Sequence, residues 1–424
     1  MTYDTPIILA SKTFMMRGVG DMEEARQSGK SDRKEELGLY VHIPFCVKKC
    51  DYCDFLSAPA TEEMKKNYIR ALLSEIRSYK GKTNGYTVPT VFIGGGTPSA
   101  IPASDIEKIM EEIWDTFLVD SDRLEATIEV NPGTVTREKL LAYQRAGINR
   151  LSFGLQSTDD RELKMLGRIH SYEEFKDNYE LAREAGFHNI NIDLMSSLPG
   201  QTVQTWENSL RTVTALKPEH ISAYSLIIEE GTPFYERYGK GALHQGELPE
   251  EETDRLLYHR TKELLEESGY HRYEISNYAR AGYECRHNSS YWIGTEYLGL
   301  GLGASSLFGG ARFHNGNDIR EYIRLCGEED KADRLPVNLR EEYKILTVKE
   351  RMEEFMFLGL RMIRGVSREE FRRRFSRNIH DVYGEKIKRL LTDHLLKVEG
   401  DRLALTEYGI DISNYVLSFF LLDE

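Results

Sequence analysis

Cysteine is scarce in this sequence, and long apolar stretches are missing from it. Only five of the 424 residues are cysteine, which argues against a disulfide-bonded framework and indicates the reducing conditions of the cytoplasm. The longest apolar runs, at 7–10 and 416–422, are much shorter than the roughly 20 residues of a membrane-spanning helix. The N-terminus lacks the basic region of a secretory signal peptide. We therefore expect a cytoplasmic protein.

Positive charge is also in the minority. The chain has 56 Lys and Arg residues against 69 Asp and Glu residues, a net charge of −13. Nucleic-acid binding requires a concentrated basic surface, so this balance argues against such a partner. The one local basic run, 372–374, directly follows acidic residues on a predicted helix, and mixed charges are typical of a solvated helix face.

Three of the five cysteines lie within eight residues, as Cys46, Cys50 and Cys53. Thiolates at this spacing can bind three irons of a 4Fe–4S cluster and leave the fourth iron open to another ligand. Zinc is the main alternative, but zinc usually takes four protein ligands in two pairs, and no second pair lies at a suitable spacing. Three unliganded thiols on one loop would be prone to unwanted reactions. The spacing therefore favours the cluster.

Strand-like and helix-like segments alternate through the middle of the chain. Apolar runs rich in β-branched residues recur six times, at 39–42, 88–93, 126–130, 150–153, 190–194 and 221–228. Segments with helical spacing separate them, at 64–79, 106–117, 137–146, 173–185 and 203–216. The alternation predicts an α/β fold with a parallel sheet and right-handed crossovers. Six units are too few for a closed eight-stranded barrel, so we expect an open, partial (β/α)6 barrel of the TIM type.

The length of the chain predicts two to three domains. Residues 1–36 show no sustained periodicity and are expected to be an N-terminal extension or a mobile tail. We expect the partial barrel at 37–270, a connecting segment at 271–345 and a C-terminal domain at 346–424. That domain has helices, then a hairpin at 395–398 and 402–405, so it resembles a small winged helix. The barrel's last helix, 250–268, is expected to pack through Leu256, Leu257, Leu264 and Leu265.

Unusual polar and glycine residues follow the ends of five successive predicted strands. They are the cysteine loop, the Gly94–Gly96 turn with Thr97, then Glu129, Gln156 and Asp193. The carboxyl ends of parallel strands meet at one edge, so these residues are expected to form one site. Taken singly, the glycines could be a tight turn, and each carboxylate could cap a helix. The glycines at 299–303 lack the spacing of a dinucleotide-binding turn and are discounted.

The cysteine spacing, the Gly-Gly-Gly-Thr-Pro-Ser turn at 94–99 and the partial barrel resemble the radical S-adenosylmethionine (SAM) superfamily. That resemblance implies a 4Fe–4S cluster whose open iron chelates SAM. Four further segments resemble the coproporphyrinogen III dehydrogenase-like group of that superfamily, namely 40–46, 128–133, 151–157 and 193–202. The likeness runs from about residue 37 to residue 424.

The same resemblance implies which residues bind the cofactors. Cys46, Cys50 and Cys53 match the cluster ligands. The SAM contacts match Tyr40, Gly95, Gly96, Thr97, Glu129, Gln156, Arg168 and Asp193. Arg168 also suits this role chemically, since a guanidinium can pair with a carboxylate through two parallel hydrogen bonds.

Two features resemble the HemW-type haem chaperone branch of this group more than its dehydrogenases. The dehydrogenases carry a further cysteine two residues after the third ligand, where this chain has Phe55. The chaperone branch carries a His-Asn-x-x-Tyr-Trp motif, which matches His287 to Trp292 here. His287 is the candidate axial ligand of haem iron, with Cys285 as an alternative. Alternatively, His287 is a buried, hydrogen-bonded core residue, and Cys285 and Cys326 are packed core cysteines.

The resemblance thus implies a haem chaperone with a 4Fe–4S cluster, SAM and haem as its cofactors. The expected partners are haem, recipient haemoproteins and a peripheral membrane protein, and dehydrogenase activity is not expected. The alternative is an oxygen-independent coproporphyrinogen III dehydrogenase, or another radical SAM enzyme that acts on a tetrapyrrole. The catalytic residues, if any, cannot be assigned from the sequence because the cofactor supplies the reaction chemistry.

Overall fold

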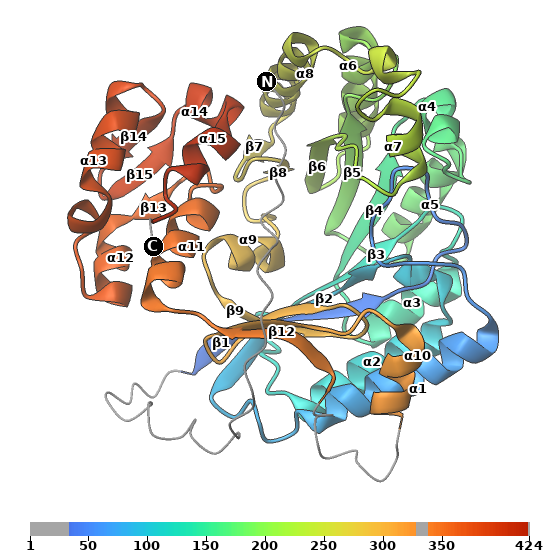
Figure 1. Cartoon of the computed structure of the whole chain (residues 1–424). Coiled ribbons are helices and arrows are strands. Elements are labelled where there is room, and N and C mark those ends of the chain that lie inside the picture. Colours follow the sequence, from blue (N-terminus) through green and yellow to red (C-terminus); the bar gives the residue numbers. More distant parts are fainter. Residues whose placement is uncertain (1–33, 328–337, 423–424) are drawn as a thin grey trace. The chain divides into compact units, whose positions relative to one another are not determined.

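A computed structural model describes residues 34–327 and 338–422 of the chain, and from Glu36 onward these residues form one compact unit. The predicted N-terminal extension, 1–36, lies almost entirely outside the described residues. A 12-stranded sheet and a separate 3-stranded sheet organise the described part (Figure 1). No helix in these residues has the length and apolar character needed to cross a membrane.

Six parallel strands form the middle of the large sheet, in chain order. They are β1 (Glu35–Ile43), β2 (Tyr86–Gly95), β3 (Glu125–Val130), β4 (Arg150–Gln156), β5 (Ile190–Ser196) and β6 (His220–Ser225). The α-helices between them are α1 (Glu62–Ser78), α2 (Ala103–Thr116), α3 (Arg137–Arg145), α4 (Asp160–Met165), α5 (Tyr172–Glu184) and α6 (Val203–Ala215). The α/β fold with six parallel strand–helix units is confirmed. The sixth strand stops at Ser225 rather than at residue 228, and Ile227 beyond it is exposed.

Six further strands, which the sequence did not predict, extend this sheet at both edges. On the β6 side lie β8 (Asn277–Ala279) and β7 (His271–Arg272), and on the β1 side lie β9 (Glu296–Leu300), β10 (Ser305–Phe308), β11 (Ala311–Asn315) and β12 (Arg340–Ile345). The pairing of β1 with β9 is parallel, whereas β9 to β12 pair antiparallel. The segment expected to be a connection therefore contributes strands to both edges of the sheet.

The remaining elements between β6 and β12 are helical. They are α7 (Pro233–Tyr238), α8 (Glu251–Glu267), α9 (Arg286–Trp292) and α10 (Ile319–Cys326), with a short 3-10 turn at Gln245–Glu247. Another 3-10 turn, Pro98–Ala100, follows β2. Helix α8 buries Leu257, Leu264 and Leu265 as expected. Leu256 is 47% exposed, so its predicted packing is wrong. The buried positions recur at the helical interval from 257, and residue 256 falls outside that stripe.

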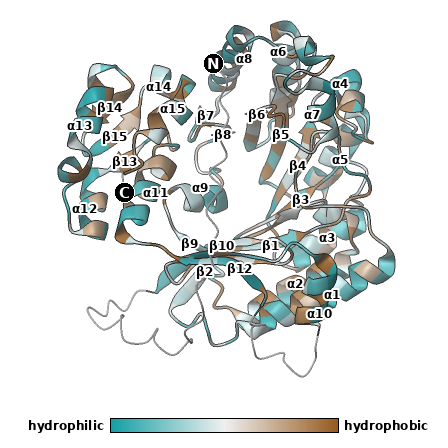
Figure 2. Ribbon diagram, in the orientation of Figure 1, coloured by the Kyte–Doolittle hydropathy of each residue, from teal (hydrophilic) through white to brown (hydrophobic). Residues whose placement is uncertain are grey.

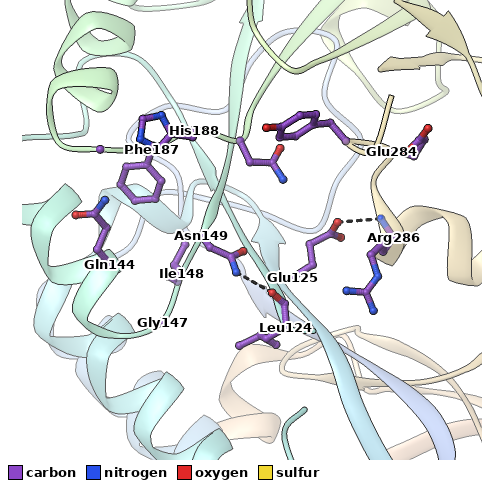
Figure 3. A pocket seen from close by; sticks show the side chains of 14 residues that line it. Leu124, Glu125, Gln144, Gly147, Ile148, Asn149, Phe187, His188, Glu284 and Arg286 are labelled. Atoms are coloured by element: carbon purple, nitrogen blue, oxygen red, sulfur yellow. Dashed lines mark hydrogen bonds between the residues drawn. The ribbon is translucent and has the colours of Figure 1, made fainter. Parts of the chain in front are cut away.

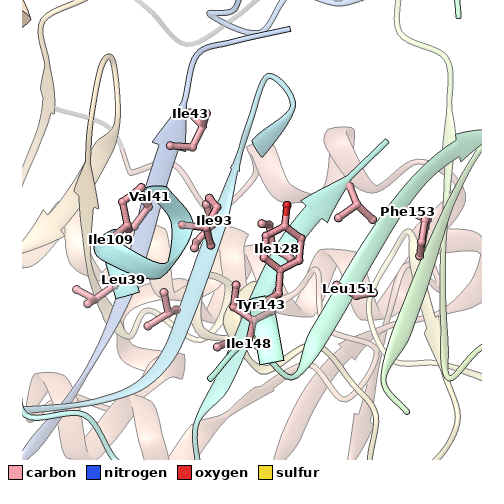
Figure 4. Close-up of a cluster of buried hydrophobic side chains, with 14 of the residues drawn as sticks. Leu39, Val41, Ile43, Ile93, Ile109, Ile128, Tyr143, Ile148, Leu151 and Phe153 are labelled. Atoms are coloured by element: carbon pink, nitrogen blue, oxygen red, sulfur yellow. The ribbon is translucent and has the colours of Figure 1, made fainter. Parts of the chain in front are cut away.

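The hydrophobic core lies between the strands and the helices that cover them. Alternate residues of β1, namely Leu39, Val41 and Ile43, are fully buried, because side chains on one face of a strand recur every second residue. They pack with apolar residues of β2 to β4 and with Ile109 and Tyr143 from α2 and α3 (Figure 4). The covering helices combine hydrophobic and hydrophilic residues (Figure 2), as amphipathic helices on a sheet require.

The C-terminal part has its own core. Its elements are α11 (Val348–Gly359), β13 (Val366–Ser367), α12 (Arg368–Phe375), α13 (Ile379–Thr392), β14 (Leu396–Glu399), β15 (Arg402–Leu405), α14 (Glu407–Asp411) and α15 (Ser413–Ser418). The expected late hairpin is present as β14 and β15, joined through Gly400 at a φ of 58°. Phe371, Tyr383, Leu403 and Phe420 belong to one buried cluster. The arrangement of helices and a hairpin is the winged-helix-like type that the sequence predicted.

Candidate cluster and cofactor site

The cysteine loop directly follows β1 and is fixed by backbone hydrogen bonds. The N–H of Cys46 donates to the Ala58 carbonyl at 3.2 Å, and the N–H of Cys53 donates to the Cys50 carbonyl at 3.2 Å. The N–H of Asp51 donates to the carbonyl of Leu166, which follows α4. All three loop thiols are free and partly exposed. The loop therefore presents three available thiols from a constrained backbone.

Two predicted SAM contacts lie beside these thiols. The hydroxyl of Thr97 donates to Cys46 Sγ at 3.7 Å, and Nη1 of Arg168 donates to Cys50 Sγ at 3.6 Å. The guanidinium thus places a positive charge beside a side chain that binds iron as an anion. Cys53 has a different environment, because burial raises the pKa of its thiol.

The glycines at the end of β2 allow the strand to approach the cysteine loop. Gly95 has a φ of 115°, and a Cβ at this residue would lie 2.6 Å from the His42 ring. A Cβ at Gly96 would lie 2.7 Å from the Phe45 carbonyl oxygen and 3.0 Å from Cys46 Sγ. The Gly96 N–H also donates to the Ile43 carbonyl at 2.9 Å. These glycines therefore do more than form a turn, since a side chain at Gly96 would displace the loop and one at Gly95 would displace the His42 ring.

The donor set fits an iron–sulfur cluster. In the described residues, no three His, Cys, Asp or Glu side chains converge closely enough to hold a single metal ion. A 4Fe–4S cluster does not need three side chains around one ion, because each thiolate binds a different iron. Cys46, Cys50 and Cys53 supply three sulfur ligands, and the missing side chain of Gly96 leaves space beside the first. These residues are the ones that would hold the cluster.

The side chains of Arg168, Gln156 and Asn131 converge beside Gly154, and the sequence did not predict a role for Asn131. Asn131 donates to the Thr97 hydroxyl at 2.8 Å and accepts from Nη2 of Arg168 at 2.9 Å. Nη2 of Arg168 also donates to the Gly154 carbonyl. Arg168 lies on the loop after α4, half-buried, and is not an exposed helix residue. Asn131 therefore fixes Thr97 and Arg168 relative to each other.

Two buried polar atoms in this group have no partner in the described residues, Gln156 Oε1 and Arg168 Nε. Gln156 has a φ of 76°, and the pairing of β4 with β5 shifts between Gly154 and Gln156. Such irregularities at the end of a strand redirect side chains and are common beside functional sites. An unpaired buried polar atom costs about 1–3 kcal/mol. This group thus contains one buried acceptor and one buried donor that no described residue satisfies.

The two predicted carboxylates lie on β3 and β5, on either side of β4. Glu129 accepts from the Gly95 N–H at 3.0 Å, and burial together with the charge of Asp193 raises the pKa of Glu129 to about 8. Asp193 accepts from Asn191 at 2.7 Å and from the Tyr224 hydroxyl at 3.1 Å, and burial raises its pKa. Neither carboxylate caps the helix that follows its strand.

A cavity of about 200 Å³ joins these carboxylates to the motif helix α9. Its lining includes Tyr40, Glu129, Asp193, His287 and Tyr291. Tyr40 lies within β1, not at its end, and its hydroxyl is 3.0 Å from Nδ1 of His42. The structure therefore divides the predicted residues into a group at the cysteine loop and a group at this cavity, and the Gly95–Glu129 hydrogen bond links the two.

His287 is buried and both of its ring nitrogens are occupied. Nδ1 lies 2.9 Å from the Thr90 hydroxyl, and Nε2 lies 2.8 Å from the Tyr291 hydroxyl. The ring stacks on Phe92 at 5.2 Å, and burial lowers the pKa of the imidazole to about 3. The neutral ring has no free nitrogen in this conformation. A bond between His287 and haem iron therefore requires the imidazole to exchange at least one hydrogen bond.

The start of the motif helix is anchored by Glu125. The carboxylate accepts from the backbone N–H of Arg286 at 3.0 Å and of His287 at 2.9 Å. Cys285 is fully buried, its thiol points to the same carboxylate, and burial raises the pKa of that thiol to about 12. Cys326 packs in the main core, as expected. Both cysteines thus have the surroundings of core residues.

The sequence offered a signal for some of the missed residues. Asn131 lies inside the segment 128–133 that resembles the dehydrogenase-like group. Tyr224 and Arg150 have no such motif. Arg150 is 2% exposed at the start of β4, and its Nε has no partner in the described residues.

Comparisons with known proteins identify the family. A model of the radical SAM superfamily matches residues 40–213, and a model of the HemN C-terminal domain matches residues 346–412. The heme chaperone HemW of Bacillus subtilis (strain 168) is 38% identical over 382 residues, which cover 90% of this chain and 98% of that protein. The heme chaperone HemW of Escherichia coli (strain K12) is 33% identical over 386 residues, which cover 91% and 98%.

A solved structure supports the fold assignment. Coproporphyrinogen III oxidase (HemN) from Escherichia coli, a radical SAM enzyme, matches with a TM-score of 0.78 over 92% of this chain and 90% of that chain. Its sequence is 24% identical, so this match shows a shared fold. Together with the sequence matches, it leads to one assignment: the chain belongs to the HemW family of the radical SAM superfamily.

Proposed function

We propose that this chain is a haem chaperone that binds haem, a 4Fe–4S cluster and SAM, and that it delivers haem to haemoproteins in the cytoplasm. One observation carries the proposal. The similarity to proteins named heme chaperones extends over nine-tenths of the chain and nearly all of the relatives' length. Recipient haemoproteins and a peripheral membrane-protein partner belong to the same proposal.

The geometry at the cysteine loop supports the cluster and SAM. A cluster bound by Cys46, Cys50 and Cys53 would supply an iron with an open position for the amino and carboxylate groups of SAM. The chain's own residues would orient the rest of the ligand. Arg168 Nε and Gln156 Oε1 are a free donor and a free acceptor beside this loop. Glu129 and Asp193 line the adjoining cavity and can accept hydrogen bonds.

The haem contact of His287 is part of the proposal. The imidazole would reach haem iron by exchanging its hydrogen bond with Tyr291, which lies one helical turn further along α9. A hydrogen bond contributes about 1 kcal/mol net, so the formation of an iron–imidazole bond can offset the loss of the bond to Tyr291. The neutral state of the buried ring favours this, because iron accepts the neutral imidazole.

One observation favours a chaperone over a coproporphyrinogen III dehydrogenase. Phe55 occupies the position of the dehydrogenases' further cysteine and is 63% exposed on the cysteine loop.

An anaerobic comparison tests the two functions directly. The full chain, reconstituted with iron and sulfide, is titrated with haem and then mixed with an apo-haemoprotein such as apomyoglobin. In parallel it is incubated with coproporphyrinogen III, SAM and a reductant. We expect stoichiometric haem binding, transfer to the apoprotein and no protoporphyrinogen. Formation of protoporphyrinogen without haem binding would replace the chaperone function by the dehydrogenase function.

A further inference from the structure

Polar side chains from β3 to β6 line the interior of the partial barrel. On β4, Leu151 and Phe153 enter the apolar core (Figure 4), whereas Arg150 and Ser152, on the opposite face of the strand, line the cavity of about 200 Å³. The interior of a TIM-type barrel is usually filled with bulky apolar residues. Here the strands instead contribute polar side chains to the cavity, namely Glu129, Ser152, Asn191, Asp193, Ser222 and Tyr224. Such a lining suits a polar ligand.

Arg150 places a permanent positive charge in this cavity. The residue is 2% exposed, and its side chain lines the cavity from the start of β4. Within residues 34–327 and 338–422, no hydrogen bond or ion pair joins the guanidinium to another residue, and its Nε is buried without a partner. A guanidinium stays charged in proteins, and a buried charge without a partner is strongly unfavourable. The arrangement therefore favours a negatively charged ligand.

The carboxylates around Arg150 have other hydrogen-bond partners. Glu125 accepts from two backbone N–H groups at the start of α9, and Figure 3 shows the one from Arg286. Asp193 accepts from two neighbouring side chains. Burial together with the charge of Asp193 raises the pKa of Glu129 to about 8, so Glu129 holds a proton at neutral pH and can donate a hydrogen bond. These three carboxyl groups therefore leave the hydrogen-bond donors of Arg150 free.

The motif helix adds a second group with free donors. Asn288, the asparagine of the His-Asn-x-x-Tyr-Trp motif, lines the same cavity from α9. Its side chain is half-buried, and its amide has no hydrogen-bond partner in the part of the chain that the structure describes. An amide nitrogen offers two donors and a guanidinium offers five. Arg150 and Asn288 can therefore bind the two oxygens of one carboxylate, and the bonds from the guanidinium are charge-assisted.

We propose that this cavity binds a carboxylate group, with Arg150 as its counter-charge and the amide of Asn288 as a second donor. The carboxylate belongs either to a propionate side chain of haem or to a free small carboxylate, and the two sources share the same chemistry. Only the carboxylate and its short chain have to enter the cavity. The first source rests on the proposed chaperone function and deepens it, because His287 lines the same cavity. The second source is independent of that function.

Two measurements on the anaerobic, reconstituted full chain distinguish the sources. In the first, ferric haem is compared with ferric haem dimethyl ester, in which both propionates are uncharged. For a propionate, the wild type should bind haem about tenfold more tightly than the ester, and Arg150→Met should reduce that ratio to about one. In the second, sodium acetate is compared with sodium chloride at equal ionic strength. For a free carboxylate, acetate should raise the midpoint of thermal unfolding of the wild type but not of Arg150→Met.

A second variant guards against misfolding of Arg150→Met. Asn288→Asp keeps the size of the side chain but adds a negative charge, so it should weaken the same response. Arg211→Met, which removes an exposed arginine on α6, is the matched control and should resemble the wild type.

The outcomes separate this site from the proposed function. Wild-type behaviour in both measurements, in either cavity variant that retains its cluster, overturns the carboxylate site. A wild-type chain that binds neither haem nor the ester overturns the chaperone function, and the acetate measurement then decides the site alone.

Discussion

Nε2 of His287 and the hydroxyl of Tyr291 lie 2.8 Å apart, on the same face of α9. The residues are four positions apart, which is the spacing that brings two side chains together on a helix. Two residues of the His-Asn-x-x-Tyr-Trp motif are therefore hydrogen-bonded to each other, and Nε2 of His287 is occupied in this structure. This hydrogen bond leads to opposite predictions for substitutions of the two residues.

Removing the imidazole should weaken haem binding, whereas releasing it should strengthen binding. We expect His287→Ala to raise the haem Kd and shift the Soret band without loss of iron–sulfur absorbance. Tyr291→Phe should lower the Kd about fivefold, because the bond of about 1 kcal/mol that competes with iron is gone. Absorbance titrations of both variants measure this effect. Weaker haem binding in Tyr291→Phe would mean that Tyr291 itself contacts haem.

The cysteine assignments predict a selective loss of the cluster. The reconstituted wild type should contain about one 4Fe–4S cluster per chain. Cys50→Ala should abolish it, since only two thiolates would remain on the loop. Cys326→Ala is the matched control, because that thiol is buried in the core. Iron and sulfide analysis gives the readout. Equal loss in both variants, or zinc in place of iron, would show that the ligand assignment is wrong.

The carboxylates at the cavity predict a loss of SAM binding with an intact cluster. We expect Asp193→Ala or Glu129→Ala to raise the SAM Kd about tenfold, which corresponds to about 1.4 kcal/mol. The cluster spectrum should persist, since neither side chain is a cluster ligand. Asp177→Ala, an exposed carboxylate on α5, serves as the control. Equilibrium dialysis with labelled SAM measures the change. Unchanged affinity in both variants would mean that these carboxylates only stabilise the barrel.

The local patterns of the sequence predicted the central strands and helices within a few residues. Their signal is periodicity, which needs no knowledge of distant residues. The edge strands gave no such signal. Strand β12 is almost entirely exposed, and β9 pairs with β1 about 260 positions away in the chain. Hydrophobic patterning therefore could not identify them, and only the folded chain shows the pairing.

The cofactor site shows the same difference between local patterns and contacts between residues far apart in the chain. Cys46, Cys50 and Cys53 were recognisable because a single loop carries all the relevant chemistry. The hydrogen bonds that occupy the His287 ring were not recognisable from the sequence, because the Nδ1 partner Thr90 lies 197 positions away. The role of Asn131 likewise depends on Arg168, 37 positions away, and no spacing rule connects an asparagine to an arginine at that distance.

A buried carboxylate that joins α1 to the edge strands predicts how stability depends on pH. Glu75 is 1% exposed and accepts from Tyr322 at 2.5 Å, Asn315 at 2.7 Å and the Gly301 N–H at 2.8 Å. Burial nevertheless raises its pKa from 4.5 to about 7. The folded chain thus holds this proton more tightly than the unfolded chain. The contribution of Glu75 to the free energy of unfolding is therefore complete below pH 4.5 and is lost as the pH rises through about 7.

We therefore expect the wild type to lose stability between pH 5 and pH 8 through this group, by about 2–3 kcal/mol at 1.36 kcal/mol per pKa unit. Glu75→Gln cannot ionise, so its free energy of unfolding should fall less over this interval, although one donor loses its acceptor at every pH. Glu111→Gln, an exposed position on α2, should keep the wild-type slope. Urea denaturation of the three anaerobic proteins at both pH values measures the slopes. Equal slopes in Glu75→Gln and wild type would show that Glu75 is already ionised at pH 5, because the three donors then outweigh its burial.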